Sequence, residues 1–278
     1  MKAIKELFRQ KNPAFKIAVV ICALWVVVIF TGYHIVPYNP IKQDLGERFL
    51  KPCSEHWFGT DSLGRDVFSR VICGARTSIT AGVVTVLFAF IIGLFYGAFA
   101  AYVGGKVDNI LMRISEMIMA FPPIILAMVI AAALGTSIMN SILAMTVIWW
   151  PNYARMMRSL VITAKENDYI TASRVMGASN IRVLLKEIIP NCVGPMIVMA
   201  TVDIGNAILT FAGLSFLGLG TQPPTPEWGT MVSEGMASFS SWWIAVFPGL
   251  AIFMVSIAAN YVGDGIRDFM DPKLRKRA

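Results

Sequence analysis

The sequence predicts an all-α polytopic membrane protein with six transmembrane helices. Composition is the first reason: 56% of the 278 residues are hydrophobic and 15% are charged, whereas about 25% are charged in a typical soluble domain. The second reason is that the apolar residues form charge-poor runs of about 20 residues, the length of a helix that crosses a bilayer. The mean hydropathy of +0.64 agrees with this fold class.

Five runs supply the six spans: 17–36, 79–103, 117–154, 192–219 and 235–263. The third run is uncharged and long enough for two helices. Its Leu134-Gly135-Thr136-Ser137 segment predicts the turn between them, because glycine and small polar residues favour turns. The fourth run contains one charged residue, Asp203, and the sixth span lies within 235–263.

The distribution of basic residues predicts the orientation. Eighteen of the 24 Lys and Arg residues fall in four segments: 1–16, 104–113, 155–190 and 264–278. Basic residues are enriched in cytoplasmic loops, so we expect both termini to be cytoplasmic. This asymmetry accounts for the net charge of +7 without a nucleic-acid partner. No small-residue cleavage site follows the first run, so we expect that helix to remain uncleaved.

Several function classes find no support in the sequence. It has no G-x-x-x-x-G-K-[S/T] loop, so ATP binding by that route is excluded, and its cysteines and histidines lack metal-site or catalytic spacing. We expect no enzyme activity and no cofactor or metal in this chain. Cys53 and Cys73 are either bridged or unpaired, and unpaired thiols are favoured. The intramembrane Asp203 is a candidate functional residue. An ion relay usually needs several buried acidic residues or histidines, so a stand-alone secondary transporter or channel is a distant alternative.

A polar segment, residues 168–190, interrupts the apolar sequence. Asn167-Asp168 can cap a short helix, and Gly177 stands where a left-handed residue would end it. Ser179 or Asn180 can cap a second helix. The segment therefore predicts two short helices at an angle on the cytoplasmic face.

The second short helix carries an apolar stripe: Ile181, Leu184, Leu185 and Ile188. Pro190 either ends this helix or opens the next span. Such a protrusion either lies in the membrane interface or docks into a groove of a partner protein.

The same segment resembles the loop E-A-A-x₃-G-x₉-I-x-L-P of permease subunits of binding-protein-dependent ABC importers. Thr171-Ala172-Ser173, Gly177 and Pro190 fall at its spacings. The departures are Thr171 for Glu, Ser173 for the second Ala, Glu187 for Ile and Ile189 for Leu. The glycine-to-proline spacing, which the bend requires, is kept.

Four other passages resemble the peptide/nickel branch of these permeases. They are HWFGTDSLGRDVFSRVICGARTSI (56–79), VDNILMRISEMIMAFPPIIL (107–126), FAGLSFLGLGTQPPTPEWGTMV (211–232) and GDGIRDFMDP (263–272). The resemblance covers the chain from its first helix onward and is closest to the C-type subunit of dipeptide, oligopeptide or nickel importers.

The resemblance implies an ABC importer type I permease core of five helices plus one N-terminal helix. Residues 1–77 would form the N-terminal cytoplasmic segment, the first transmembrane helix and a periplasmic loop. Residues 78–264 would form the core, with a cytoplasmic coupling loop at about 165–190. Residues 265–278 would form a cytoplasmic tail.

The implied function is half of an inner-membrane translocation pathway for short peptides, with nickel or a nickel chelate as the alternative. The expected partners are a paralogous permease, one or two ATPase subunits that hold ATP and Mg²⁺, and an extracytoplasmic solute-binding protein. The residues implied in ATPase coupling are Thr171, Ala172, Ser173, Arg174, Gly177, Ala178, Arg182 and Pro190. Asp203, Asn206 and Glu116 are the candidates for the translocation path.

Two smaller features have more than one reading. Arg65 and Asp61 either face a solute-binding protein or hold an outer turn through local salt links, which is the favoured reading. Gly213, Gly218 and Gly220 either line a constriction or allow close helix packing, and packing is favoured.

Overall fold

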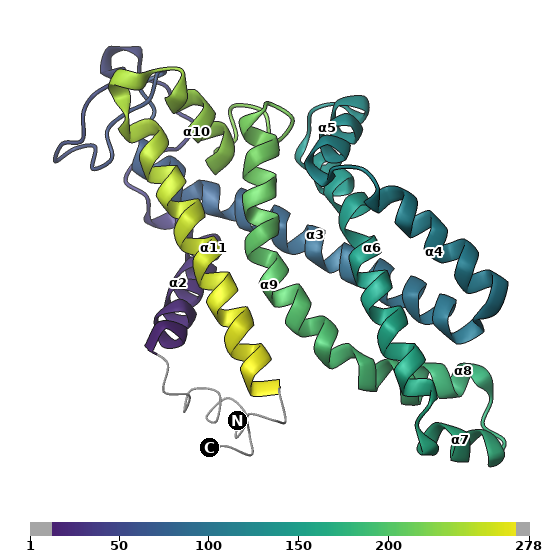
Figure 1. Cartoon of the computed structure of the whole chain (residues 1–278). Helices are drawn as coiled ribbons and strands as arrows, with labels where there is room; N and C mark the ends of the chain where they lie inside the picture. The colour runs from purple at the N-terminus through teal and green to yellow at the C-terminus, as the bar shows by residue number, and fades with distance from the viewer. Residues whose placement is uncertain (1–12, 271–278) are drawn as a thin grey trace.

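A computed structural model describes residues 13–270, and this part of the chain is built from helices (Figure 1). The helices are α2 (Pro13–Ile35), α3 (Val67–Val103), α4 (Gly105–Met119), α5 (Pro123–Leu134), α6 (Ile138–Lys165), α7 (Asp168–Val175), α8 (Asn180–Val183), α9 (Ile189–Phe216), α10 (Trp228–Met236) and α11 (Trp243–Met270). Short turns lie at η1 (Leu45–Glu47), η2 (Leu184–Ile188) and η3 (Phe239–Ser241).

The predicted all-α membrane fold is confirmed. Within the described residues, four helices are long and apolar enough to cross a bilayer: Pro13–Ile35, Val67–Val103, Asn180–Phe216 and Trp243–Phe269. The bent pair α4–α5 counts as a fifth span if it is taken as one unit. The uncharged residues predicted as the fourth span form the N-terminal part of α6. Helix α6 as a whole is less apolar than the four helices above, because it contains Asn140, Asn152 and Arg155.

The predicted third span differs from the structure. The run 117–154 was expected to hold two helices that break at 134–137, but α4 ends at Met119 and α5 begins at Pro123, with an 88° bend between them. The cause is local: Pro122 and Pro123 have no backbone N–H and cannot continue the hydrogen bonds of α4. The predicted break at 134–137 is confirmed, since α5 ends at Leu134 and the Ser137 side chain caps α6.

Two other spans are longer than the hydropathy predicted. Helix α3 begins at Val67 rather than 79, because the Asp66 side chain caps it by accepting a hydrogen bond from Ser69 N at 2.7 Å. Arg70, in its first turn, is buried and lies within 4 Å of carboxylates of Asp61 and Glu234. A hydropathy search places the end of a helix too far inward when the terminal turn contains charged residues. In the same way, α11 continues past residue 263 to Met270.

The core centres on the packing of α3 against α6. Gly93 and Gly97 of α3 lie so close to α6 that an added Cβ would overlap Tyr153 and the carbonyl of Ala154. Helix α9 packs on both α3 and α6, and α11 packs on α9. Within this chain an added Cβ on Gly213 or Gly218 would meet nothing within 4 Å, whereas an added Cβ on Gly220 would meet Ser215. The packing role is therefore supported for Gly220 and stays a prediction for the other two.

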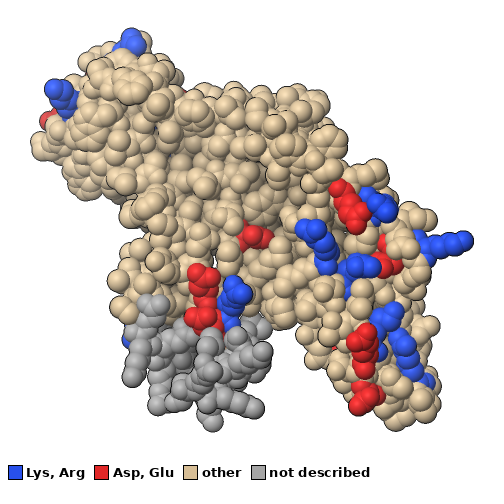
Figure 2. Space-filling view, viewed as in Figure 1, with Lys and Arg blue, Asp and Glu red and all other residues tan. Residues whose placement is uncertain are grey.

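The elements divide between two ends of the molecule. The loop 36–66 and α10 lie at one end, and α7, α8, the start of α2 and the end of α11 lie at the other (Figure 1). In Figure 2 charged side chains gather on the lower limbs and at the tip of the upper loop, and a broad band between them carries almost none. This distribution is that of a protein whose middle lies in hydrocarbon.

Buried ion pairs hold together the end formed by the loop 36–66 and α10. Arg65 pairs with Asp61 at 2.6 Å and with Glu234 of α10 at 2.9 Å, so the favoured salt-link reading is confirmed. The Glu227 carboxylate caps α10 by accepting hydrogen bonds from the backbone N–H groups of Gly229 and Thr230. It also accepts a hydrogen bond from the Ser78 hydroxyl of α3. Cys53 and Cys73 are free thiols, as favoured.

Candidate coupling element and transmembrane cavity

Residues 168–183, comprising α7 and α8, form a protrusion that we call the coupling knob. Gly177 ends α7 with φ of +87°, in the left-handed region that favours glycine. Gly177 N donates to Arg174 O and Ala178 N donates to Ser173 O, both at 3.0 Å. These two bonds define a Schellman motif. The predicted glycine end is confirmed, and so is the Ser179 cap, whose hydroxyl accepts from Arg182 N.

The knob is attached to the transmembrane helices through Tyr102, at the C-terminal end of α3. Its hydroxyl donates to Asn180 Oδ1 at 2.9 Å, and the Arg174 guanidinium lies 5.7 Å from the ring centroid. Lys165 Nζ, at the end of α6, donates to the carbonyls of Ala101 and Tyr102 at 3.0 and 3.1 Å. The sequence analysis missed Tyr102, which contributes both a hydrogen bond and a cation–π contact.

The base of the knob is buried and its tip is exposed. Ile170 and Val183 have no exposed surface, whereas Val175, Met176 and Ile181 are 83%, 80% and 71% exposed. The predicted single apolar stripe is therefore divided: Ile188 is fully buried and Leu184 half-buried, but Ile181 and Leu185 face outward. The π turn η2 changes the helical phase within the stripe, which explains this division.

Helix α8 does not stop before the next span. It runs through η2 into α9, so that residues 180–216 form one helical path and Pro190 lies in the first turn of α9. Of the two expected roles, Pro190 opens the span. Ile189 N donates to Leu184 O across the π turn, which leaves room for a proline that can donate no hydrogen bond.

The eight residues predicted for ATPase coupling lie on the knob or directly after it. Thr171, Ala172, Arg174, Gly177, Arg182 and Pro190 are exposed, and Ser173 and Ala178 are half-buried. The structure thus brings these residues to one end of the molecule. Their role in contacting an ATPase stays a prediction.

A second feature is a cavity of about 500 Å³ beside the middle of α9. It is lined by Met156, Pro195, Val198, Met199, Val202, Asp203 and Arg267, which belong to α6, α9 and α11. In Figure 2 the molecule is hollowed on the same side, between the lower end of α11 and the limb that ends in α7 and α8. Tyr153 donates a hydrogen bond from its hydroxyl to Asp203 Oδ2 at 2.7 Å.

The structure brings together two of the three residues predicted for the translocation path. Asp203 lines the cavity and accepts a hydrogen bond from the Asn206 side chain, although Asn206 itself is exposed and does not line the cavity. Glu116 lies on α4, exposed, and pairs with Arg113 at 3.6 Å. The sequence analysis missed Tyr153 and Arg267: Tyr153 carried no signal in a long apolar run, and Arg267 was counted only as a basic residue of the tail.

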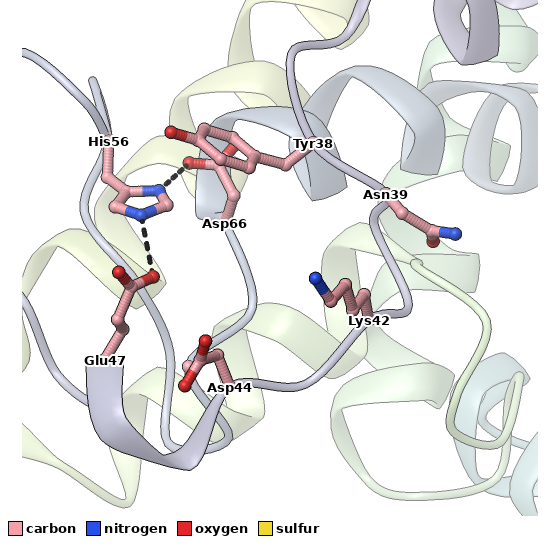
Figure 3. Close-up of a pocket in the computed structure, with 8 residues that line it drawn as sticks. Tyr38, Asn39, Lys42, Asp44, Glu47, His56 and Asp66 are labelled. Atoms are coloured by element: carbon pink, nitrogen blue, oxygen red, sulfur yellow. Dashed lines mark hydrogen bonds and ion pairs between the residues drawn. The ribbon is translucent and has the colours of Figure 1, made fainter.

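A second pocket, of about 240 Å³, lies in the loop 36–66 (Figure 3). The buried His56 ring lies between Asp66 (Nδ1···Oδ1 2.8 Å) and Glu47 (Nε2···Oε2 3.2 Å) and stacks on Tyr38. Burial alone would lower the pKa of His56, but the two carboxylates outweigh it and raise the pKa above its ordinary value. Among residues 13–270, no three His, Cys, Asp or Glu side chains are placed to hold a metal ion.

Comparison with known proteins covers nearly the whole chain. The model for the family described as "Binding-protein-dependent transport system inner membrane component" matches residues 89–276. The nickel transport system permease protein NikC of Escherichia coli is 40% identical over 97% of this chain and 98% of its own length. The glutathione transport system permease protein GsiD of Escherichia coli is 43% identical, covering 96% of this chain and 89% of its own.

Two further similarities agree with these. The probable D,D-dipeptide transport system permease protein DdpC of Escherichia coli is 41% identical over 92% of this chain and 86% of its own. Among solved structures, a chain of the inward-facing MetNI methionine ABC transporter matches with a TM-score of 0.61 and 18% identity, over 73% of this chain and 97% of that one. The structural match supports the fold.

Proposed function

The chain belongs to the family of inner membrane components of binding-protein-dependent transport systems, as a permease of an ABC importer, and from this premise we propose that it forms half of a translocation pathway for short peptides. Such a permease requires an ATPase partner and a membrane, and it performs transport rather than an enzymatic reaction.

The observation that carries the substrate class is the similarity to permeases of two peptide importers. One relative belongs to a D,D-dipeptide system and another to a glutathione system, and glutathione is a tripeptide. The 40% identity to the nickel permease supports nickel or a nickel chelate as the second candidate. The identities are too similar to decide between the two, so the substrate requires an uptake measurement.

The coupling knob supplies a mechanism for the ATP-driven step. Its exposed apolar tip, Val175 and Met176, is suited to a groove of the ATPase, which is expected to bind ATP and Mg²⁺. A shift of the knob would reach α3 through Tyr102 and α9 through the continuous helical path from α8. Arg158 of α6 holds Asp108 of α4 through two hydrogen bonds of 2.7 and 2.6 Å, so α4 would move with α6.

The remaining partners and the orientation are part of the same proposal. A paralogous permease would complete the pathway as a heterodimer, and an extracytoplasmic solute-binding protein would deliver the substrate. The protein would lie in the inner membrane with both termini cytoplasmic. Two observations support this orientation: the Lys and Arg asymmetry, and the location of the start of α2, the end of α11 and the coupling knob at one end of the molecule.

Uptake by cells that express the complete importer, with and without this chain, tests the proposal. Labelled dipeptide and radioactive nickel are supplied in parallel. We expect dipeptide uptake to depend on this chain and nickel uptake not to depend on it. Loss of nickel uptake alone would replace the peptide proposal by the nickel candidate.

A further inference from the structure

The cavity beside α9 has the size and lining of a small-molecule site. Its volume of about 500 Å³ falls within the roughly 300–1,000 Å³ of typical ligand pockets. Its walls are mostly apolar, from Met156, Pro195, Val198, Met199 and Val202. The only charged groups among its lining residues are Asp203 and Arg267. An apolar cavity with two convergent groups of opposite charge selects a ligand by its charges.

Asp203 supplies the anionic group. It lies inside a membrane-spanning helix, where an ionisable residue is costly and is usually retained for function. Its Oδ2 accepts the Tyr153 hydroxyl hydrogen bond at 2.7 Å, which fixes the carboxylate. Asp203 is half-buried and faces the cavity, and the Asn206 side chain, about one turn along α9, also donates a hydrogen bond to it. Each carboxylate oxygen has two lone pairs, so Asp203 can still accept hydrogen bonds from a bound ammonium group.

Arg267 supplies the cationic group from α11. Within residues 13–270 it has neither an ion-pair nor a hydrogen-bond partner, although Asp264 precedes it by one turn of the same helix. Helices α9 and α11 are in contact at Val202 and Gly263, so Arg267 lies one turn beyond this contact, toward the knob end of the molecule. A guanidinium binds a carboxylate through two parallel hydrogen bonds.

We propose that this cavity binds the two ends of a short zwitterionic peptide, with the ammonium group at Asp203 and the terminal carboxylate at Arg267. The inference rests on the proposed peptide function and names the site within it. The apolar walls contact the side chains with little selectivity, so one cavity can serve many sequences, while free termini are required at both ends.

A phospholipid is the competing occupant, since Arg267 could bind its phosphate and the walls its acyl chain. Asp203 argues against it, because its hydrogen-bond partners Tyr153 and Asn206 are neutral, and a carboxylate set against an acyl chain would lose hydration without gaining a cationic partner. A peptide ammonium supplies that partner.

The test is protection of a cysteine in the cavity wall. The complete importer without its binding protein is placed in lipid nanodiscs, with the four native cysteines of this chain replaced and Met199→Cys introduced. Maleimide labelling is followed with Ala-Phe, N-acetyl-Ala-Phe or Ala-Phe amide. We expect Ala-Phe to slow labelling, and each capped peptide to require a roughly tenfold or higher concentration for the same protection.

Charge-removing variants assign each end. Arg267→Gln should make Ala-Phe and its amide equivalent, and Asp203→Asn should do the same for Ala-Phe and its acetyl form. Tyr153→Phe is the matched control, because it removes the hydrogen bond to Asp203 and keeps the carboxylate. If Asp203 only held Tyr153, Tyr153→Phe would weaken protection as much as Asp203→Asn does. Lys16→Gln, an exposed charge loss on α2, should change nothing.

Three results would overturn the inference alone. Equal protection by free and doubly capped peptides would reduce the cavity to an apolar surface. Protection by anionic phospholipid but by no peptide would assign it to lipid. Normal Ala-Phe uptake by the importer with its binding protein, but no protection, would reject the site and leave the proposed function standing. Absence of Ala-Phe uptake would instead remove the proposed function and the inference together.

Discussion

Gly177 determines the angle between the two helices of the coupling knob. Its φ of +87° is accessible to glycine at no cost, and the space around it is open, with no atom within 4 Å of an added Cβ. Backbone conformation, rather than room for a side chain, is therefore what restricts this position. A β-branched residue would cost roughly 1–2 kcal/mol there, whereas Asn visits the left-handed region readily.

Gly177→Val should therefore abolish most ATP-driven uptake, while the permease still assembles in the membrane. Gly177→Asn should retain most of it. Uptake by proteoliposomes containing equal amounts of each complex measures the difference. Equal activity of the two variants would show that the angle at Gly177 is unimportant for coupling.

His56 makes the outer loop dependent on pH. Its pKa is raised in the folded protein because Asp66 and Glu47 flank the ring and outweigh the effect of burial. A raised pKa contributes stability that is fully present below the ordinary histidine pKa of about 6.5 and is lost as pH rises through the folded value.

Hydrogen exchange in residues 44–66, corrected for the intrinsic effect of pH, should therefore show more protection at pH 6 than at pH 8. His56→Gln should remove this difference, and His34→Gln, an exposed histidine of α2, should leave it intact. A pH difference that persists in His56→Gln would assign the effect to another group.

At the scale of helices, close glycine contacts set how near α3 and α6 can approach. An added Cβ on Gly97 would overlap the carbonyl of Ala154, and both belong to helix backbone that cannot move alone. Gly213, also inside a helix, has open space around it. Overpacking typically costs about 1–3 kcal/mol, whereas replacing an unhindered helical glycine by alanine gains about 0.5–1 kcal/mol.

Gly97→Ala should therefore lower the thermal midpoint of the purified complex, and Gly213→Ala should leave it unchanged or raise it slightly. The matched pair separates packing from helix propensity, since both changes add the same methyl group. A lower midpoint for Gly213→Ala would mean that a partner subunit packs against that face.

Local signals predicted the positions where one residue decides the structure. The turn at 134–137, the left-handed Gly177 and the Ser179 cap follow from glycine and capping preferences. At Pro122 and Pro123 the sequence allowed either a hinge or a mild kink and favoured the kink, because a proline in an apolar helix is often tolerated. The structure has an 88° bend there. The early start of α3 was not predicted either, because Arg70 in its first turn is compensated by Asp61 and by Glu234, and the position of Glu234 in α10 could not be read from the sequence.

The two candidate sites also differ in how far the sequence could predict them. The coupling residues follow one another in sequence, so a motif could locate them on one protrusion. The cavity is different, because Tyr153, Asp203 and Arg267 come from three helices. Only the packing of α6, α9 and α11 places them around one space, and no pattern along the chain encodes that proximity.

The whole molecule has a polar end that carries the coupling knob, an apolar middle and an opposite end, with the loop 36–66 and α10, that is held by ion pairs (Figures 1 and 2). Together with the family assignment, this arrangement supports one account: an ATPase partner moves the knob, and the knob moves the helices that bound the pathway. The knob and the cavity are connected by one helical path, since α8 continues into α9, which carries Asp203.

Crosslinking between the knob and the ATPase tests this account most directly. Ala172→Cys, exposed on α7, is paired with single cysteines in the ATPase cleft, with Cys53 replaced to remove the exposed native thiol. Met139→Cys, exposed at the start of α6, is the control at the other end of the molecule. We predict a crosslink from Ala172→Cys whose yield changes with ATP, and none from Met139→Cys. An intact, transporting complex in which no cysteine placed in residues 168–182 crosslinks to the ATPase would contradict the account.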